Sequence, residues 1–277
     1  MDILQEIAER TKERIEAKKK NYPLERLKEA VCSVADNGAY GFPFEKSLRA
    51  KKTQEGAYAA AGANEIAFIC EIKKASPSKG VIAEDFPYLE IAKDYEEAGA
   101  AAVSVLTEPY YFMGDHRYLI EIASTVKIPL LRKDFTVDSY MIYEAKKYGA
   151  SAVLLICAIL DKQTLSEYIS IADSLGLSSL VEAHNENEVK MALDCGARVI
   201  GVNNRDLKTF EVDTGNSIRL RKLVPDDIIF VSESGIRTAQ DVELLRQNGV
   251  DAVLVGETLM RQIDRKAAIA RLRSGKQ

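Results

Sequence analysis

The stretch IAFICEIKKASPSKG, residues 66–80, joins a short apolar run to a loop of charged and small polar residues. The run at 66–70 is typical of a buried β-strand. Side chains alternate between the two faces of a strand, so Glu71 and Lys73 share one face. The Ser, Pro and Gly residues that follow are typical of a turn. An acid and a base therefore leave the strand beside a candidate anion-binding loop, although a solvated strand end with a surface ion pair would give the same pattern.

Seven further apolar runs follow along the chain, and amphipathic segments separate them. The eight runs span residues 66–72, 101–106, 128–131, 152–156, 178–181, 199–202, 228–231 and 252–255. The intervening segments with helical spacing include 88–98, 139–148, 187–195 and 239–248. Continuous apolar strands that alternate with helices predict a parallel sheet.

A repeated glycine indicates how this sheet closes. Gly99, Gly149, Gly196 and Gly249 each follow a helical segment and precede an apolar run. Glycine is favoured just after a helix because the chain there adopts a left-handed conformation. The intervals of roughly 50 residues each cover two βα units. Eight such units predict an α/β fold, an eight-stranded parallel βα (TIM) barrel, and the absence of a GxGxxG fingerprint disfavours a dinucleotide-binding sheet.

The chain of 277 residues predicts a single βα-barrel domain over 1–277, with the barrel itself at 64–273. Residues 1–60 differ in character and predict a helical N-terminal extension. Within it, Ile3, Leu4, Ile7 and Ile15 fall near one helical face. The extension is compatible with a lid over the barrel, a plug beneath it or a dimer contact, and the sequence does not choose between them.

Composition and charge exclude several classes of protein. The hydrophobic content of 47% is that of a globular protein, and the net charge of −4 gives no footprint for nucleic acid. No apolar run is long enough to cross a membrane, and the charged N-terminus does not resemble a secretory signal. Four scattered cysteines and two histidines predict reduced thiols and no metal site. We expect a cytoplasmic monomer, with a weak dimer as the alternative, and neither nucleic-acid nor membrane partners.

Candidate catalytic residues lie where the strands end, since barrels of this type carry their active sites at the carboxyl ends of the strands. The residues at those positions are Glu71, Lys73, Lys133, Glu182, Asn203, Ser232, Ser234 and Gly256. Two lysines and two carboxylates at one mouth are costly for stability, because charges in a partly dry cleft must be paired. The set therefore favours an acid–base site over unrelated rim residues. His184 is expected to face the helices, and His116 to lie on the surface.

Three loops predict a site for a phosphorylated small molecule. Ser234-Gly235-Ile236 and Val255-Gly256-Glu257 follow the last two strands, and the loop with Ser76 follows the first. Glycine lets backbone N–H groups approach an anion, and these loops occupy the usual phosphate position of phosphate-binding barrels. Three apolar residues in other loops either line a slot for an aromatic ring or only pack the loops: Phe112, Phe135 and Leu207.

Several of these stretches together resemble indole-3-glycerol-phosphate synthase. In chain order they are EIKKASPSKG (71–80), LTEPYYFMG (106–114), LLRKDF (130–135), VEAHNENE (181–188), GVNNRDLKTF (201–210), VSESGI (231–236) and LVGETLM (254–260). The resemblance runs from about Phe44 to Met260. It implies a carboxy-lyase of tryptophan biosynthesis that converts 1-(2-carboxyphenylamino)-1-deoxyribulose 5-phosphate to indole-3-glycerol phosphate, CO2 and water, without a metal or organic cofactor.

The resemblance also implies a role for each site residue. Lys133 would be the general acid at the ketone oxygen, and Lys73 would bind the substrate carboxylate and can donate a later proton. Glu182 would be the base that restores aromaticity, with Glu71 and Asn203 as orienting groups. The phosphate would be held by Ser76, Ser234, Gly235, Gly256 and the backbone at Glu257. The ring would be flanked by Phe112, Phe135 and Leu207, with Arg205 in support.

Two other functions also fit these residues. A Schiff-base aldolase would use Lys133 as its nucleophile. A non-catalytic barrel that binds sugar phosphates would serve regulation or assembly. A binding module has no need of two carboxylates opposite two lysines, so Glu182 disfavours the second of these alternatives.

Overall fold

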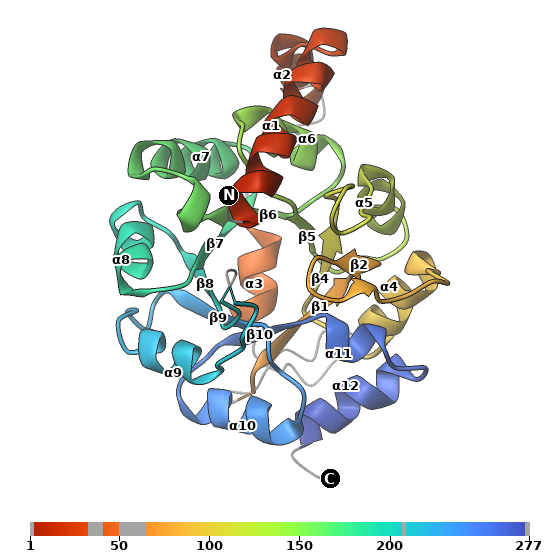
Figure 1. Ribbon diagram of the computed structural model, residues 1–277, viewed down its shortest axis with the longest axis vertical. Helices are drawn as coiled ribbons and strands as arrows, with labels where there is room; N and C mark the ends of the chain where they lie inside the picture. Colours follow the sequence, from red (N-terminus) through yellow and green to blue (C-terminus); the bar gives the residue numbers. More distant parts are fainter. Residues whose placement is uncertain (1–2, 33–40, 50–64, 207–208, 275–277) are drawn as a thin grey trace.

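The computed structural model describes residues 3–32, 41–49, 65–206 and 209–274. Its centre is a closed barrel of eight parallel strands (Figure 1). The strands are β1 (Ala67–Ile72), β4 (Ala102–Leu106), β5 (Leu130–Lys133), β6 (Ala152–Ile156), β7 (Ser178–Ala183), β8 (Val199–Asn203), β9 (Ile229–Glu233) and β10 (Ala252–Val255). They lie in chain order around the barrel, and β10 closes it by pairing with β1. The predicted eight-stranded βα barrel is confirmed.

Helices alternate with the strands and cover the outside of the barrel (Figure 1). They are α4 (Tyr88–Glu97), α5 (His116–Ala123), α6 (Ser139–Lys147), α7 (Lys162–Ser174), α8 (Glu186–Asp194), α9 (Gly215–Arg221), α10 (Ala239–Gln247), α11 (Glu257–Met260) and α12 (Arg265–Ser274), with a 3₁₀ turn η1 at Cys157–Ile159. The strands are buried on both faces, which explains their continuous apolar sequences. The four repeated glycines have φ between 74° and 85° directly after α4, α6, α8 and α10, as the repeat predicts.

The residues that point into the barrel follow a period of two along each strand. Apolar residues such as Ile69, Leu131, Leu180 and Val231 fill the interior. One step further toward the carboxyl end, the same period brings charged side chains inward, namely Glu71, Lys133, Glu182 and Glu233. The barrel is therefore packed below and charged at its mouth. Several strand boundaries differ from expectation by one or two residues; the run expected at 128–131, for example, forms β5 two residues later.

The N-terminal extension contains three described helices, and two of them, α1 and α3, lie at opposite ends of the barrel. Helix α1 (Ile3–Asn21) buries Leu4, Ile7 and Ile15, and its first two turns lie at the mouth, where Ile3, Leu4 and Ile7 line the cavity. Helix α2 (Leu24–Cys32) packs beside α6. Helix α3 (Pro43–Arg49) buries Phe44 and Leu48 against the first residues of several strands, at the floor of the barrel. The extension thus supplies both a cover and a plug, two of the three roles that the sequence left open.

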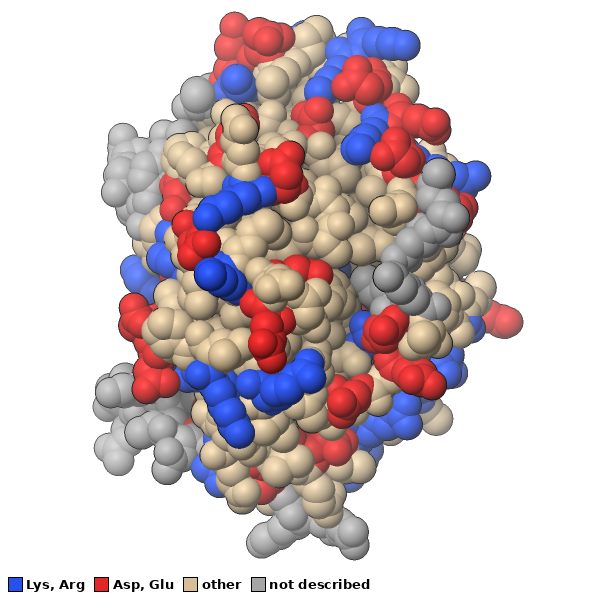
Figure 2. Space-filling model, turned by 60° about the vertical axis from the view of Figure 1, so that its left-hand side comes forward, with Lys and Arg blue, Asp and Glu red and all other residues tan. Residues whose placement is uncertain are grey.

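Charged side chains of both signs are interleaved over the face shown in Figure 2. Among the described helices, none is long and apolar enough to cross a membrane.

Candidate active site

The carboxyl ends of the strands enclose a cavity of about 430 Å³. Its lining includes every predicted site residue that the structure describes except Ser232: Glu71, Lys73, Ser76, Phe112, Lys133, Phe135, Glu182, Asn203, Arg205, Ser234, Gly235, Gly256 and Glu257. Leu207 lies outside the described residues. The carboxyl ends of eight parallel strands meet at one end of a barrel, so residues up to about 190 positions apart converge here.

The lysine of β5 lies between two carboxylates. Lys133 Nζ is 3.1 Å from Glu182 Oε2 on β7 and also contacts Glu233 Oε2 on β9. Burial alone lowers the pKa of Lys133, but the charges of Glu233 and Glu182 outweigh it and raise the pKa above its ordinary value. Lys133 therefore holds its proton at neutral pH.

The two carboxylates differ in what surrounds them. Glu182 Oε1 accepts a hydrogen bond from Asn203 at 3.3 Å and lies 3.5 Å from His184 Nε2. Burial raises the pKa of Glu182, yet Lys133 and His184 lower it by more. Glu233 is the opposite case, because burial dominates and raises its pKa to about 7. Within the described ranges, Glu233 Oε1 has no hydrogen-bond partner.

A second acid–base pair lies on β1 and in the residue just beyond it. Lys73 Nζ donates to Glu71 Oε1 at 2.6 Å. Gly256, after β10, packs directly against this pair, since a Cβ there would lie 2.3 Å from Glu71 Oε1 and 3.1 Å from Lys73 Nζ. The loop after β10 and the pair on β1 thus fit together only because residue 256 has no side chain.

The three predicted phosphate loops line the same cavity as the Glu71–Lys73 pair. Ser76 stands in a hairpin of β2 (Ala75–Ser76) and β3 (Gly80–Val81). Ser234 and Gly235 have φ of 67° and 83°, so two successive residues of the loop after β9 are left-handed. The Glu257 carboxylate pairs with Arg261 at 3.0 Å, which leaves its backbone as the group available to an anion. The cavity lining here also includes Arg237 and Arg261, two cations that the sequence reasoning did not single out.

Apolar side chains form another part of the cavity wall. The rings of Phe112 and Phe135 lie with their centroids 6.1 Å apart. The loop that carries Phe112 is folded around the buried carboxylate of Glu108, which accepts the backbone N–H groups of residues 110, 111 and 112 at 2.7–3.0 Å. Ile3, Leu4 and Ile7 of α1 complete this wall.

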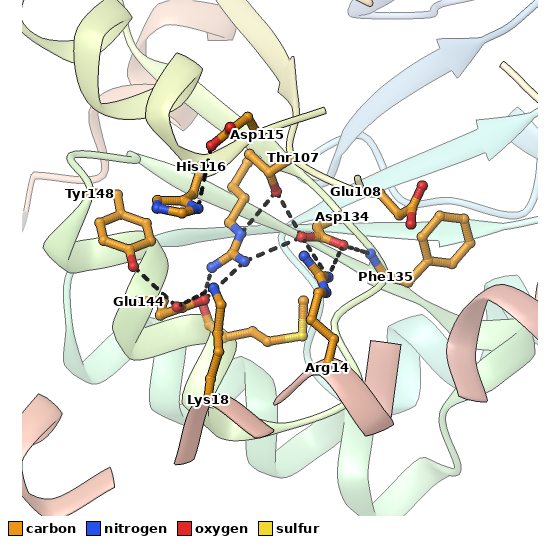
Figure 3. A network of polar contacts seen from close by, with 12 residues as sticks. Arg14, Lys18, Thr107, Glu108, Asp115, His116, Asp134, Phe135, Glu144 and Tyr148 are labelled. Atoms are coloured by element: carbon orange, nitrogen blue, oxygen red, sulfur yellow. Dashed lines mark hydrogen bonds and ion pairs between the residues drawn. The ribbon is translucent and has the colours of Figure 1, made fainter. Parts of the chain in front are cut away.

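A buried ionic network joins Arg14 and Lys18 of α1 to Asp134 and Glu144 (Figure 3). Asp134 is 1% exposed and accepts hydrogen bonds from Arg14 at 2.9 Å and from Thr107 at 2.7 Å. Arg132 bridges Asp134 at 3.2 Å and Glu144 at 3.1 Å, and Lys18 of α1 also donates to Glu144 at 2.7 Å. Burial raises the pKa of Asp134, but the positive charges of Arg14 and Arg132 have the larger effect. The pKa of Asp134 is therefore below its ordinary value. The residues on both sides of the carboxylate, Lys133 and Phe135, line the cavity.

Three sequence-based expectations need correction or addition. Glu233, rather than its neighbour Ser232, faces the cavity, and the Ser232 hydroxyl instead contacts Asn204 and Ser217 among buried polar groups. His184 does not turn to the helices alone, because it lies two residues after Glu182 and its ring reaches that carboxylate. His116 is half exposed, as expected, and stacks on Tyr148.

The sequence matches the family model for indole-3-glycerol phosphate synthase over residues 4–272. A protein named indole-3-glycerol phosphate synthase from Ruminiclostridium cellulolyticum is 58% identical over 271 residues, 98% of each chain. The protein of that name from Endomicrobium trichonymphae is 54% identical and covers 94% of this chain and 95% of its own. Among solved structures, 3-hexulose-6-phosphate synthase from Salmonella typhimurium is similar in fold, with a TM-score of 0.63 at 13% identity over 76% of this chain and 98% of that one.

Fold and site together define a βα-barrel enzyme with paired lysines and carboxylates at the carboxyl ends of its strands. The relatives specify which enzyme of this class it is. The chain belongs to the indole-3-glycerol phosphate synthase family, and it is a carboxy-lyase of tryptophan biosynthesis. The family and activity implied by the sequence motifs are confirmed.

Proposed function

We propose that the cavity binds 1-(2-carboxyphenylamino)-1-deoxyribulose 5-phosphate and closes its indole ring by acid–base catalysis. The phosphate lies among Ser76 and the loops at Ser234-Gly235 and Gly256-Glu257. The anthranilate ring lies against Phe112 and Phe135, with Arg205 as a further contact from the loop after β8. The role of Leu207, which is outside the described residues, stays a prediction from the resemblance. In this substrate the ketone carbon lies between the phosphate and the ring, and the proposal is supported by Lys133, Glu182 and Glu233 lining the same cavity as the phosphate loops and the two phenylalanines.

The observation that carries the mechanism is the position of Lys133 between Glu182 and Glu233. A lysine that must act as a nucleophile has to lose its proton, whereas a general acid has to keep it. Two carboxylates against one ammonium favour the charged form. Lys133 accordingly protonates the ketone oxygen as the ring carbon that bears the carboxylate attacks the ketone carbon.

The remaining steps use the other paired groups. Loss of CO2 breaks the bond to the carboxylate carbon and returns its electron pair to the ring. Lys73, held by Glu71, binds that carboxylate beforehand and gives a proton to the hydroxyl that leaves as water. Glu182, oriented by Asn203, removes the C–H proton that completes the aromatic ring. Glu233 accepts a hydrogen bond from Lys133 and holds its ammonium group in place, a role that was not inferred from the sequence.

The experiment that tests this assignment replaces Lys133 by Met and follows the fluorescence of the indole product. The chemical step should slow by about 10²–10⁴-fold, the usual share of a positioned acid, while substrate affinity falls much less. Lys162→Met is the matched control, because Lys162 is exposed and pairs with Asp194 away from the cavity. Borohydride added during turnover should leave the protein mass unchanged. A reduced substrate adduct on Lys133 would instead favour the aldolase.

The proposal extends to the state of the whole protein. We propose a single cooperative domain over 1–277 that works in the cytoplasm, without nucleic-acid partners, as a monomer, with a weak dimer as the alternative. The described cysteines Cys70, Cys157 and Cys195 are free thiols, which supports a reducing compartment. Light scattering over a range of concentrations distinguishes monomer from dimer, and a single coincident unfolding transition by two probes tests the single domain.

A further inference from the structure

Glu182 and Glu233 both contact Lys133 through one carboxylate oxygen, and they differ in what surrounds the other oxygen. Both Glu182 Oε2 and Glu233 Oε2 contact the ammonium group. The second oxygen of Glu182 faces Asn203 and the imidazole of His184, whereas the second oxygen of Glu233 has no hydrogen-bond partner within residues 3–32, 41–49, 65–206 and 209–274. Glu182 thus has two possible cations beside it, and Glu233 has one.

The imidazole of His184 is held firmly in this position. Its Nδ1 lies 3.1 Å from Glu188 Oε2, and its backbone N–H donates to the same oxygen at 2.8 Å. Glu188, at the start of α8, is itself fixed by Asn185 at 2.6 Å. Asn216 of α9 donates to the His184 carbonyl at 3.2 Å. His184 Nε2 is buried and makes no hydrogen bond to any described group, so its nearest charged partner is Glu182 Oε1 at 3.5 Å.

The charged groups around His184 favour its protonated form. Glu182 faces it from β7, Glu188 from α8 and Glu233 from β9, while the cation Lys133 lies beyond Glu182 on β5. Burial lowers the pKa of His184, but the three carboxylates raise it above its ordinary value. With both nitrogens protonated, Nδ1 donates to Glu188 and Nε2 points its proton at Glu182.

We propose that His184 is a positioning residue that selects which of the two carboxylates beside Lys133 is the ionised base. Pairs of titratable groups whose surroundings separate their pKa values divide into acid and base roles. The positive charge of His184 keeps Glu182 ionised. When one of the two glutamates beside Lys133 binds a proton, that glutamate is therefore Glu233. The inference rests on the proposed function, because it concerns the residue that takes the substrate proton.

The activity test compares three variants across pH. The rate falls at low pH as Glu182 becomes protonated, so this acid limb reports the pKa of the base. His184→Gln removes the cation and should move the midpoint of the acid limb up by about one pH unit. His184→Lys restores a cation with a different shape and should return the limb toward its original position. His116→Gln alters the only other histidine, away from the cavity, and should leave the limb in place.

The outcomes distinguish the role of His184 from the proposed role of Glu182 as the base. An unchanged limb in His184→Gln, or equal shifts in the Gln and Lys variants, refutes the role of His184 alone. Glu182→Gln should abolish the acid limb, and a limb that persists refutes Glu182 as the base. Proton NMR gives a measurement that needs no variant at position 184. With two histidines in the chain and His116→Gln to assign them, His184 should titrate above the ordinary histidine pKa, and titration below it overturns the proposal.

Discussion

Arg14 of the N-terminal helix α1 binds the carboxylate of Asp134, the residue that directly follows Lys133, at 2.9 Å. The cover of the cavity and the strand that carries the proposed acid are therefore joined by one buried ion pair. Arg14 is 12% exposed and the Asp134 side chain is fully buried, so solvent does little to screen the interaction.

Replacing Arg14 by Met should destabilise the protein and slow turnover. The free energy of unfolding should fall by about 3 kcal/mol, the lower end of the cost of removing one partner of a buried ion pair, because Asp134 keeps Arg132. Urea unfolding measures this change. Lys12→Met, which removes an exposed cation of the same helix, should stay within about 0.5 kcal/mol of the parent. Equal effects of the two substitutions would contradict an anchoring role for Arg14.

The stability of the protein should depend on the ionisation of Glu233. Its pKa in the folded protein is about 7, above the 4.5 of the free side chain, so the folded state binds this proton more tightly than the unfolded state. This contribution is fully present at pH below about 4.5 and is lost as the pH rises through 7. The Glu233→Gln variant lacks this pH-dependent contribution to the free energy of unfolding, because glutamine does not titrate. Urea unfolding at pH 5 and pH 8 should therefore show the variant gaining stability relative to the parent at the higher pH, and a difference independent of pH would contradict the raised pKa.

The phosphate loops should contribute to catalysis and not only to affinity. Binding energy from a non-reacting group orients the reacting end, so a substrate without its phosphate should be turned over far more slowly at saturation. Inorganic phosphate should compete with the intact substrate. Equal turnover of the two substrates would mean that the loops around Ser234 and Gly256 are turns without a ligand.

Gly256→Ala should disturb the Glu71–Lys73 pair. The added Cβ would lie 2.3 Å from Glu71 Oε1, closer than such atoms approach, so the carboxylate has to move and release Lys73. We expect kcat to fall and KM for the substrate to rise, since both the pair and the phosphate loop shift. Gly80→Ala is a control with open space around the new Cβ, although its φ of 65° adds some backbone strain. A variant at 256 with unchanged kinetics would show that the pair tolerates displacement.

Much of the fold follows from the sequence because the signals are local. Each strand is a continuous apolar run, and each repeated glycine marks a helix end that only a left-handed residue fits. The position of α1 and α3 does not follow, since an amphipathic helix shows which face it buries but not against what. Only the folded chain shows α1 above the barrel and α3 beneath it.

The site was predictable where a charge interrupts an apolar run, as at Lys133 and Glu182. It was not predictable at β9, which is buried on both faces and contains Ser232 and Glu233, with Ser234 directly after it. Alternation of polarity is missing there, so the sequence does not indicate which residue points inward. The inward series Ile229, Val231 and Glu233 becomes visible only from the register of the barrel. The position of His184 was predictable, since it stands two residues after Glu182 and so on the same face, and the expectation that it faces the helices was wrong.

The anchoring of α1 also has a consequence for the order in which the chain is made. Arg14 and Lys18 precede their partners Asp134 and Glu144 by 120 and 126 residues. At synthesis rates of about 5–20 residues per second, the helix emerges on the order of ten seconds before those carboxylates exist. During that interval the apolar stripe of Leu4, Ile7 and Ile15 has no barrel to cover. Helix α1 therefore remains without its buried ionic partners, exposed to chaperones and to other nascent chains, until Glu144 has been translated.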